Sequence, residues 1–391
     1  MENSNIFRTI TLSETTVFIV DNRGKTVPTE DKGIPLIATN CINNKNLYPI
    51  YERIRYISQN TYDTWFRAHP IAGDILLTLK GSQNGAVCLV PEEVGFVIAQ
   101  DMVGLRANTN VINSLFLFAA LRSPKVQSQI KNLDVSGVIP HLKKSDFDKL
   151  LLPYPNAYIQ KEIGEFYFNL SSKIDLLNKQ NQTVQELSNT FFRQWMIKEA
   201  KDEWEQKPLS VIAIFLNGLA CQKFPPKNDI DKLPVLKIKD LKVGISNSSD
   251  WATIDVKPEY IIESGDVIFA WSASLMVKMW DGEKCILNQH LFKVTSSDYP
   301  KWFYYQWCKY HLANFIAIAQ AHATTMGHIK RGDLDNAMCV VPTDDELKVM
   351  SEQMVPLMQK MENNSKQIKT LENMRDILLP KLMSGEVRIV T

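Results

Sequence analysis

The sequence predicts an α+β protein in which two mixed α/β globular domains are separated by two long helices that form a coiled coil. Three observations carry this prediction. The chain has 391 residues, which is too long for one ordinary hydrophobic core and favours two domains. It repeats itself after 187 residues, and each repeat ends in a heptad pattern of apolar residues. The expected order is therefore domain, helix, domain, helix.

The internal repeat is clearest where "IPHLKKSDFDKLLLPYP", residues 139–155, aligns without a gap on "MGHIKRGDLDNAMCVVP", residues 326–342. Upstream, "GDILLTLKGS" at residues 73–82 matches "GDVIFAWSAS" at residues 265–274 once small length changes are allowed. The chain is therefore a tandem duplication whose halves diverged upstream and stayed similar downstream. The gap-free stretches pair His141 with His328, Lys143 with Lys330, Lys144 with Arg331, Asp146 with Asp333 and Asp148 with Asp335.

After each of these stretches, apolar residues recur at heptad a and d positions, which we call the seam. Sixteen of the twenty seam positions are apolar, where 45% apolar composition predicts about nine. Each helix of about 35 residues is expected to be about 50 Å long. Two amphipathic helices, each packed inside its own domain, are the alternative left open. The seam residues that carry the prediction are Ile163, Leu170, Ile174, Leu177, Asn181, Val184, Phe191, Leu357, Met361, Asn364, Ile368, Leu371 and Leu378.

Three residues of the predicted helices are polar or helix-breaking and depart from the apolar heptad pattern. Asn181 and Asn364 occupy seam positions, where asparagine fixes register and partner choice at some loss of stability. Pro356 lies inside the second helix and predicts a kink there.

Upstream of each helix, short apolar runs and turn residues predict a mixed α/β domain. Residues 73–79 and 81–90 resemble a strand, a polar loop and a second strand, and residues 265–271 with 281–288 predict the same hairpin in the second copy. Helices are expected at 113–130, broken or kinked by Pro124, and at 302–320. The predicted boundaries are residues 1–157 for the first domain, 158–200 for the first helix, 201–343 for the second domain and 344–391 for the second helix with the C-terminal tail.

The composition narrows the class of protein. The net charge is +1, from 44 basic and 43 acidic residues. The chain as a whole therefore does not attract DNA or acidic lipid electrostatically, and any phosphate contacts are expected to be local or shared with partner proteins. No apolar run reaches the roughly 18 residues of a membrane span, and the N-terminus has no leader pattern. Six cysteines without a C-x-x-C pair indicate neither a zinc site nor a disulfide framework. A cytoplasmic protein is expected.

The sequence lacks the motifs that a catalytic function would require. Gly24, Lys25 and Thr26 suggest a phosphate-binding loop, but Ile19 stands where that loop needs a glycine. No G-x-G-x-x-G, H-E-x-x-H or G-x-S-x-G motif is present, nor the Asn/Asp-Pro-Pro-aromatic loop of amino-methyltransferases. We expect no catalytic residue, no metal site and no bound cofactor.

The histidine clusters of the repeat leave three interpretations open. Solvated structural polarity and phosphate contact by the neighbouring basic residues are each favoured over catalysis, because both copies of the cluster lead directly into a long helix. The basic residues in question are Lys143, Lys144, Lys330 and Arg331.

The tips of the predicted hairpins are polar and differ between the copies. Two copies that read two different DNA sequences need this difference, because base-edge hydrogen bonds change with the target while phosphate contacts need not. Ordinary loop drift predicts the same divergence. The candidates are Lys80, Ser82, Gln83 and Asn84 in the first copy, and Ser272, Ser274 and Lys278 in the second.

Four stretches carry a family resemblance: "LENMRDILLPKLMSGEVRI" at 371–389, "SGVIPHLKKSDFDKLLLPYP" at 136–155, the stretch at 326–342, and "LSNTFFRQWM" at 187–196. Together they resemble the specificity subunit of Type I restriction-modification systems, over essentially the whole chain. The resemblance implies two target recognition domains in a pseudo-twofold repeat, each reading half of a bipartite double-stranded DNA target, and an antiparallel helix pair that sets the gap.

The same resemblance implies partners and cofactors that the chain itself does not hold. Two modification subunits would bind S-adenosylmethionine and methylate adenine at N6, and restriction subunits would use ATP and Mg to translocate and cut DNA. The specificity subunit would have no activity alone. A stand-alone bipartite DNA-binding regulator, or a coiled-coil adaptor without enzyme partners, is the alternative, and a recognition module fused to another restriction enzyme is a further one.

Overall fold

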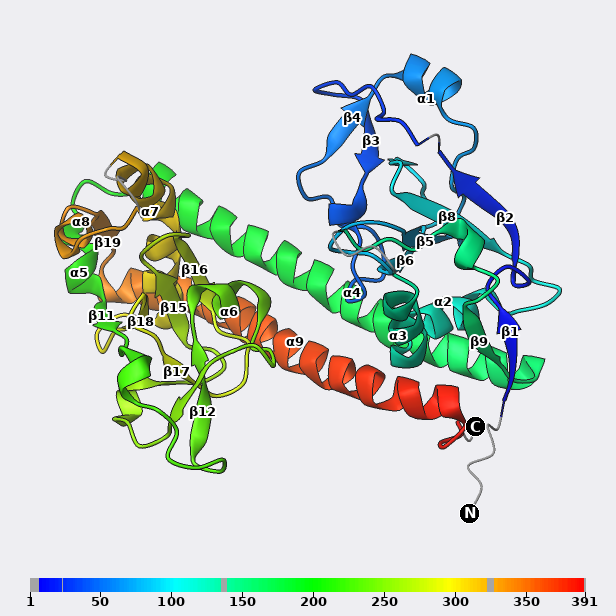
Figure 1. The fold of residues 1–391 in the computed structure, drawn as a ribbon. Coiled ribbons are helices and arrows are strands. Elements are labelled where there is room, and N and C mark those ends of the chain that lie inside the picture. The colour runs from blue at the N-terminus through cyan, green and yellow to red at the C-terminus, as the bar shows by residue number, and fades with distance from the viewer. Residues whose placement is uncertain (1–6, 23, 135–138, 322–326, 390–391) are drawn as a thin grey trace. The chain divides into compact units, whose positions relative to one another are not determined.

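The computed structural model describes residues 7–22, 24–134, 139–321 and 327–389. The chain forms two compact units: unit 1 contains Met1–Leu177 and Ile368–Thr391, and unit 2 contains Asn178–Gln367. Two long helices, α4 (Ala157–Arg193) and α9 (Asp344–Ser384), each contribute one part to either unit (Figure 1). Every unit thus combines a globular α/β part with a segment of both long helices.

The described residues of unit 1 form two sheets and one separate strand pair. The larger sheet has the order β2-β8-β5-β6 and is antiparallel throughout, while the smaller one has the order β4-β3-β7 with β3 and β7 parallel. β1 pairs with β9, which leads into α4. The strands are β1 (Arg8–Thr11), β2 (Thr16–Asp21), β3 (Ile34–Ile37), β4 (Arg55–Ile57), β5 (Ile75–Thr78), β6 (Val87–Leu89), β7 (Val97–Ile98), β8 (Met102–Ala107) and β9 (Leu151–Tyr154).

Among its described residues, the globular part of unit 1 also has the α-helices α1 (Gln59–Trp65), α2 (Ser114–Arg122) and α3 (Pro124–Asn132). The side chain of Asn113 caps α2 by accepting a hydrogen bond from the Phe116 N–H at 3.0 Å. Pro124 begins α3 because its ring cannot continue α2, so the predicted break is confirmed.

Unit 2 repeats this topology and adds one strand, β14, to the smaller sheet. Its sheets have the orders β11-β18-β15-β16 and β13-β12-β17-β14, with β12 and β17 parallel, and β10 pairs with β19 before α9 begins. The elements are β10 (Glu205–Pro208), β11 (Ile214–Asn217), β12 (Lys232–Leu236), β13 (Trp251–Thr253), β14 (Ile261–Ile262), β15 (Val267–Ala270), β16 (Met276–Met279), β17 (Cys285–Leu287), β18 (Leu291–Thr295), β19 (Met338–Val341), α5 (Leu209–Ile212), α6 (Ile238–Val243), α7 (Lys301–Ala321) and α8 (Arg331–Asp335). The duplication read from the sequence is therefore a duplication of fold.

The hairpin predicted for the second copy is wrong in its second strand. β15 pairs with β16, whereas residues 281–288 supply β17, which lies beside β12 in the other sheet. Trp280 explains the separation: it is buried, and its indole N–H donates to the Glu283 carbonyl at 2.8 Å, which closes a turn between the strands. The half-buried run Met276–Met279 has no alternating pattern that would have marked it as a strand.

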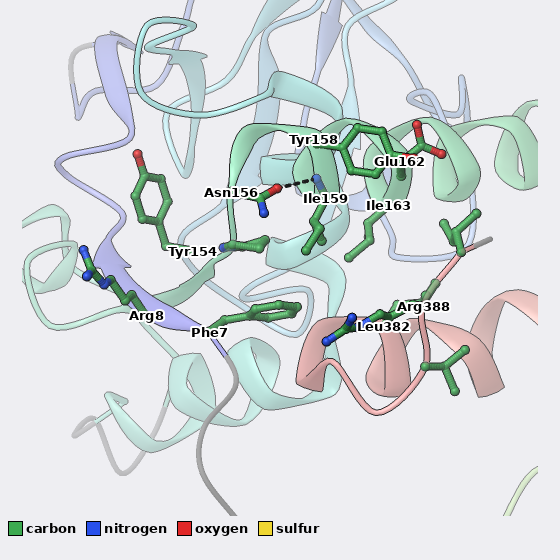
Figure 2. Close-up of a pocket in the computed structure, with 13 residues that line it drawn as sticks. Phe7, Arg8, Tyr154, Asn156, Tyr158, Ile159, Glu162, Ile163, Leu382 and Arg388 are labelled. Atoms are coloured by element: carbon green, nitrogen blue, oxygen red, sulfur yellow. Dashed lines mark hydrogen bonds between the residues drawn. The ribbon is translucent and has the colours of Figure 1, made fainter. Parts of the chain in front are cut away.

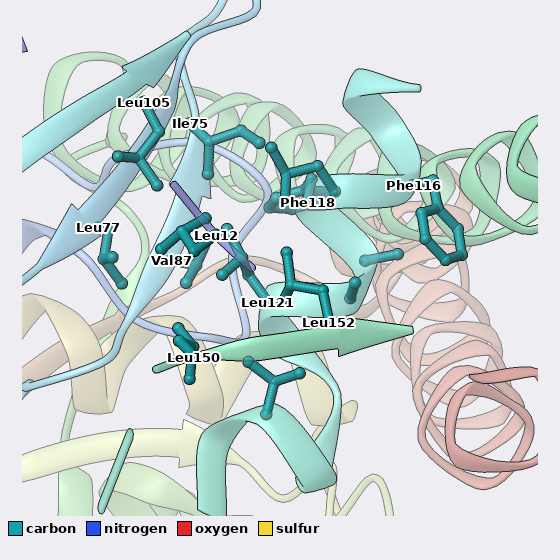
Figure 3. Close-up of a cluster of buried hydrophobic side chains, with 14 of the residues drawn as sticks. Leu12, Ile75, Leu77, Val87, Leu105, Phe116, Phe118, Leu121, Leu150 and Leu152 are labelled. Carbon is teal, nitrogen blue, oxygen red and sulfur yellow. The ribbon is translucent and has the colours of Figure 1, made fainter. Parts of the chain in front are cut away.

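The core of unit 1 lies between the larger sheet and α2 (Figure 3). Ile75 and Leu77 point into this core together with Phe116 and Phe118, while Leu76 enters a second apolar cluster on the other face. Successive residues of a strand point to opposite faces, so a strand with both faces covered reads as a continuous apolar run. This explains the unbroken "ILLT" of β5.

The two long helices pack antiparallel in each unit. In unit 1, Leu177 lies in an apolar cluster with Ile368, and Ile163 shares the main core with Leu382. In unit 2, Asn181 is hydrogen-bonded to Asn364. The residue number falls along one helix as it rises along the other, which defines the antiparallel direction. All twenty seam positions are buried or half-buried.

α9 is unbroken from Asp344 to Ser384, so Pro356 does not end the helix. Pro356 is exposed, as is Glu352, whose carbonyl loses its helical N–H donor to the proline ring. Water can satisfy that carbonyl on the solvent face, which makes the proline tolerable there.

The start of α9 is held by a network around Glu346. Its carboxylate accepts hydrogen bonds from the Thr343 N–H at 3.1 Å, from the Trp204 indole N–H at 2.7 Å and from Lys201 Nζ at 2.5 Å. Bonds from Lys201 and then Thr343 lower the Glu346 pKa to about 2. The network ties the segment after α4 to the first turn of α9.

We expect Glu346→Gln to lower stability at neutral pH and to have little effect at pH 2. A lowered folded pKa contributes stability that is fully present above the ordinary value of 4.5 and is lost as pH falls towards about 2. The difference in thermal midpoint between parent and variant, measured from pH 7 to pH 2, should therefore shrink within that window. A difference that stays constant with pH would contradict the assignment.

Candidate nucleic-acid interface

In unit 1, the tip of the β5–β6 hairpin is joined by backbone bonds to the segment that precedes β9. The Leu142 N–H donates to the Leu79 carbonyl at 2.8 Å, and the Gly81 N–H donates to the Pro140 carbonyl at 3.0 Å. Lys80 and His141 form an antiparallel bridge between these bonds. The hairpin tip and the histidine segment, far apart in sequence, therefore form one surface.

Unit 2 builds the same junction from equivalent residues. The Ile329 N–H donates to the Trp271 carbonyl at 3.1 Å, and the Ala273 N–H donates to the Gly327 carbonyl at 2.9 Å. Ser272 and His328 form an antiparallel β-bridge between these bonds. Ala273 has a φ of 57°, a conformation rare outside glycine, and Gly81 at the aligned position of unit 1 has a φ of 91°. Both repeats thus retain one backbone path despite different side chains.

Two further chain segments reach this place in each unit, and we call the whole surface the loop edge. The turn before β8 joins it through a bond from the Leu79 N–H to the Asp101 carbonyl, and the turn before β18 does so through a bond from the Trp271 N–H to the His290 carbonyl. The end of β2 joins it through Asp21, which is ion-paired with Lys144. The loop edge is therefore assembled from four separate parts of the sequence.

Most sequence candidates of unit 1 lie on this edge. Lys80, Ser82, Gln83 and Lys143 are exposed. Asn84 is half-buried, and its side chain accepts from the Leu142 N–H at 3.3 Å, so it supports the tip. The ammonium of Lys144, by contrast, is occupied by the carboxylate of Asp21.

The candidates of unit 2 divide in the same way. Ser274, Lys330 and Arg331 are exposed, whereas Ser272 is buried with its hydroxyl 3.2 Å from Nδ1 of His290. Lys330 is the N-cap residue of α8, and its backbone N–H donates to the Asp333 carboxylate at 2.7 Å. The aspartate of this histidine cluster is therefore a helix cap.

Lys278 does not lie on the loop edge. It stands on β16 opposite Ile268, and its ammonium is paired with Asp281 at 3.0 Å. Together with Asn181 and Tyr305 it lines a cavity of about 260 Å³ beside the long helices of unit 2. The structure thus separates Lys278 from Ser272 and Ser274.

Residues that sequence reasoning missed complete the loop edge of unit 2. The Trp271 indole N–H donates to Asn217 Oδ1 at 3.2 Å, and the Trp271 ring lies 5.9 Å from the His290 ring and 6.2 Å from the His328 ring. The alignment of "GDVIFAWSAS" could have identified Trp271, because it places this residue next to the hairpin tip. No sequence pattern marks Asn217 or His290, because only the pairing of strands brings them to the loop edge.

One cavity of unit 1 is lined by residues at the two ends of the long helices. This cavity measures about 600 Å³ and lies between the start of α4 and the end of α9, lined largely by apolar and aromatic side chains such as Phe7, Tyr154 and Leu382 (Figure 2). Asn156 caps α4 there by accepting from the Ile159 N–H at 3.0 Å. Over the part of the chain that the structure describes, no group of three His, Cys, Asp or Glu residues is placed to hold a metal ion.

The described helices also include none long and apolar enough to cross a membrane. Fold and site together define a class: a duplicated binding protein, in which each unit presents one loop edge and shares a pair of long antiparallel helices. The model of the Type I restriction modification DNA specificity domain matches the chain twice, over residues 17–186 and 201–373. The chain belongs to this family.

Named relatives are similar over most of their length. The Type I restriction enzyme MjaIX specificity subunit of Methanocaldococcus jannaschii is 24% identical, over 71% of this chain and 69% of the relative. The HindI specificity subunit of Haemophilus influenzae is 19% identical, over 81% and 86%. The crystal structure of the Type I restriction-modification S subunit from M. genitalium aligns with a TM-score of 0.56 and 14% identity, over 98% of both chains, which shows a shared fold.

Proposed function

We propose that this chain reads a bipartite double-stranded DNA target, with one half-site for the loop edge of each unit, as the specificity subunit of a Type I restriction-modification complex. One observation carries the proposal: the same backbone junction is built twice with different side chains, and Lys80 is exposed in unit 1 where unit 2 has the buried Ser272. A shared scaffold with different polar groups suits two different sequences.

The chemistry of the complex belongs to the partners in this proposal. Two modification subunits would use S-adenosylmethionine to methylate adenine, and restriction subunits would use ATP and Mg to translocate and cut DNA. The chain itself would position the complex on its DNA target. The exposed side chains of Lys143, Lys330 and Arg331 would contact phosphates, and residues of the hairpin tips would contact base edges in the major groove. A net charge of +1 agrees with partners that supply much of the phosphate contact. The site of action would be the cytoplasm.

Mapping N6-methyladenine in cells with and without the gene tests the proposal. A split motif that is methylated only when the gene is present is the expected result. If every methylated motif remains after deletion, the chain has no role in modification. Neighbouring genes for an adenine methyltransferase and a translocase would separate this function from that of a stand-alone regulator.

Substituting Lys80 is expected to alter one half-site only. Lys80 is exposed at the tip of unit 1, and a lost base or phosphate contact costs roughly 1–3 kcal/mol of binding energy. Lys80→Ala should therefore weaken or change the half-site of unit 1, read as methylation frequency across target variants, and Ser274→Ala should do so for unit 2. Lys278→Met is the matched comparison, with a smaller expected effect because Asp281 already pairs with the ammonium. Equal loss at both half-sites would indicate a folding defect instead.

A further inference from the structure

The two neighbouring seam layers around the boundary of the units differ in chemistry. In unit 2, Nδ2 of Asn364 donates to Asn181 Oδ1 at 2.8 Å and to Gln180 Oε1 at 2.9 Å. In unit 1, Leu177 packs against Ile368 in a small apolar cluster. Asn364 is only 2% exposed, so its amide depends on these protein partners and not on water. We call the first pair the asparagine layer and the second pair the aliphatic layer.

The internal repeat makes these two layers equivalent to each other. A shift of 187 residues carries Leu177 onto Asn364 and Asn181 onto Ile368. One layer is thus the polar counterpart of the other. In each layer the two helices nevertheless match, because amide faces amide and aliphatic side chain faces aliphatic side chain.

This matching holds only when α4 pairs with α9. The helices come from one repeat, so two copies of α4 from different chains could pair antiparallel through most of the same apolar seam. In such a pair of two α4 helices, Asn181 of the second chain takes the place of Ile368, so Leu177 of one chain lies opposite Asn181 of the other. Two copies of α9 would likewise place Asn364 opposite Ile368. Each mismatch removes the hydrogen bond between Asn181 and Asn364 and sets an amide against an aliphatic side chain, which disfavours the wrong pair by roughly tenfold. In a pair of two α9 helices, Gln367 stands where Gln180 does and is the one partner that Asn364 keeps.

The other polar seam residues do not link the two helices in this way. The Ser188 hydroxyl donates to the Val184 carbonyl of its own helix at 2.9 Å. Arg375 donates to the neighbouring Asp376 carboxylate at 2.8 Å and to the Lys45 carbonyl at 3.4 Å. Among the described residues, the asparagine layer is the one seam layer whose two members hydrogen-bond each other across the helices.

We propose that the asparagine layer selects pairing: it makes the two halves of the chain pair with each other and rejects pairing of either half with the same half of a second copy. A tandem duplication needs such a device, because its two helices remain similar enough to exchange. The asymmetry between layers, and not the presence of asparagine as such, supplies the selection.

The test uses the full chain and two variants. Asn181→Ile with Asn364→Leu makes both layers aliphatic and therefore identical under the repeat. The control adds Leu177→Asn and Ile368→Asn to those changes, which exchanges the layers, keeps the composition and restores the asymmetry. Each protein is unfolded in denaturant, refolded at several concentrations and measured for molar mass by size exclusion with light scattering.

The parent and the layer-exchanged control should refold as monomers, and the two-substitution variant should form at least about tenfold more dimer. A two-substitution variant as monomeric as the parent, or a control that dimerises equally, would overturn the proposal. The second readout rests on the proposed function: methylomes of the two-substitution variant should gain symmetric motifs that contain one half-site twice. If the two-substitution variant dimerises but the parent chain directs methylation of no split motif, the inference about helix pairing still holds and only the proposed function is contradicted.

Discussion

Removing seven residues from each long helix, 171–177 from α4 and 368–374 from α9, is expected to shorten the gap between the two half-sites and to leave both half-site sequences unchanged. The deleted segments pack on each other through Ile174, Leu177, Ile368 and Leu371, so their loss leaves the remaining seam residues in their heptad frame. Seven residues of helix span about 10 Å. That length corresponds to about three base pairs of DNA at 3.4 Å each.

The measurement is binding of the purified complex to duplexes whose gap is shortened one base pair at a time, together with the methylome of cells that carry the deletion. A length-matched control replaces the exposed residues of the same two segments and keeps the four apolar ones, and it should retain the original gap. An unchanged gap in the deletion variant would show that the helices do not set the spacing. Thermal unfolding of both variants identifies a folding failure, in which binding to every duplex is lost.

Replacing Arg122 by methionine is expected to destabilise unit 1 by about 3 to 5 kcal/mol. The Arg122 guanidinium is buried at the end of α2 and donates to the carbonyls of Val87, Asn43 and Asn46. It also lies 4.4 Å from the centre of the Phe118 ring. Methionine fills much of the same volume but leaves three carbonyls without this donor, and buried carbonyls without partners are costly.

Chemical denaturation followed by circular dichroism gives the change in the free energy of unfolding. Lys131→Met, on the exposed side of α3, is the matched control and should change that free energy by less than about 0.5 kcal/mol. A loss below about 1 kcal/mol for Arg122→Met would mean that water replaces the guanidinium at the three carbonyls. Burial lowers the pKa of Arg122, but the group remains charged at neutral pH, so we expect no pH dependence of this effect near pH 7.

Features with a local or periodic cause could be predicted from the sequence. The repeat appeared because "GDILLTL" and "GDVIFAW" place the same turn before the same strand, and the structure shows the shared cap: Asp74 accepts from the Ile71 N–H, and Asp266 accepts from the Glu263 N–H. The break at Pro124 follows from the geometry of one residue. The heptads indicated two long helices because a seam repeats every seven residues whatever its partner.

Features that depend on contacts between distant segments could not be predicted. β16 was missed because a half-buried strand with no alternating pattern gains its place from β15 and from the turn that buried Trp280 closes. Lys278 was placed at the hairpin tip, but that same pairing puts it opposite Ile268 and beside Asp281.

Local spacing and periodicity were enough to predict the duplicated architecture and the two long helices, and they showed that the sequence contains none of the familiar catalytic motifs. Tertiary structure alone decided the loop edge, where Asn217, Trp271 and His290 meet through strand pairing. It also decided that Asn181 faces Asn364, because antiparallel packing fixes which residues of two similar helices oppose each other. The physical reason is the same in both cases: the energy of a buried polar group depends on a partner far away in the chain, and only the folded backbone chooses that partner.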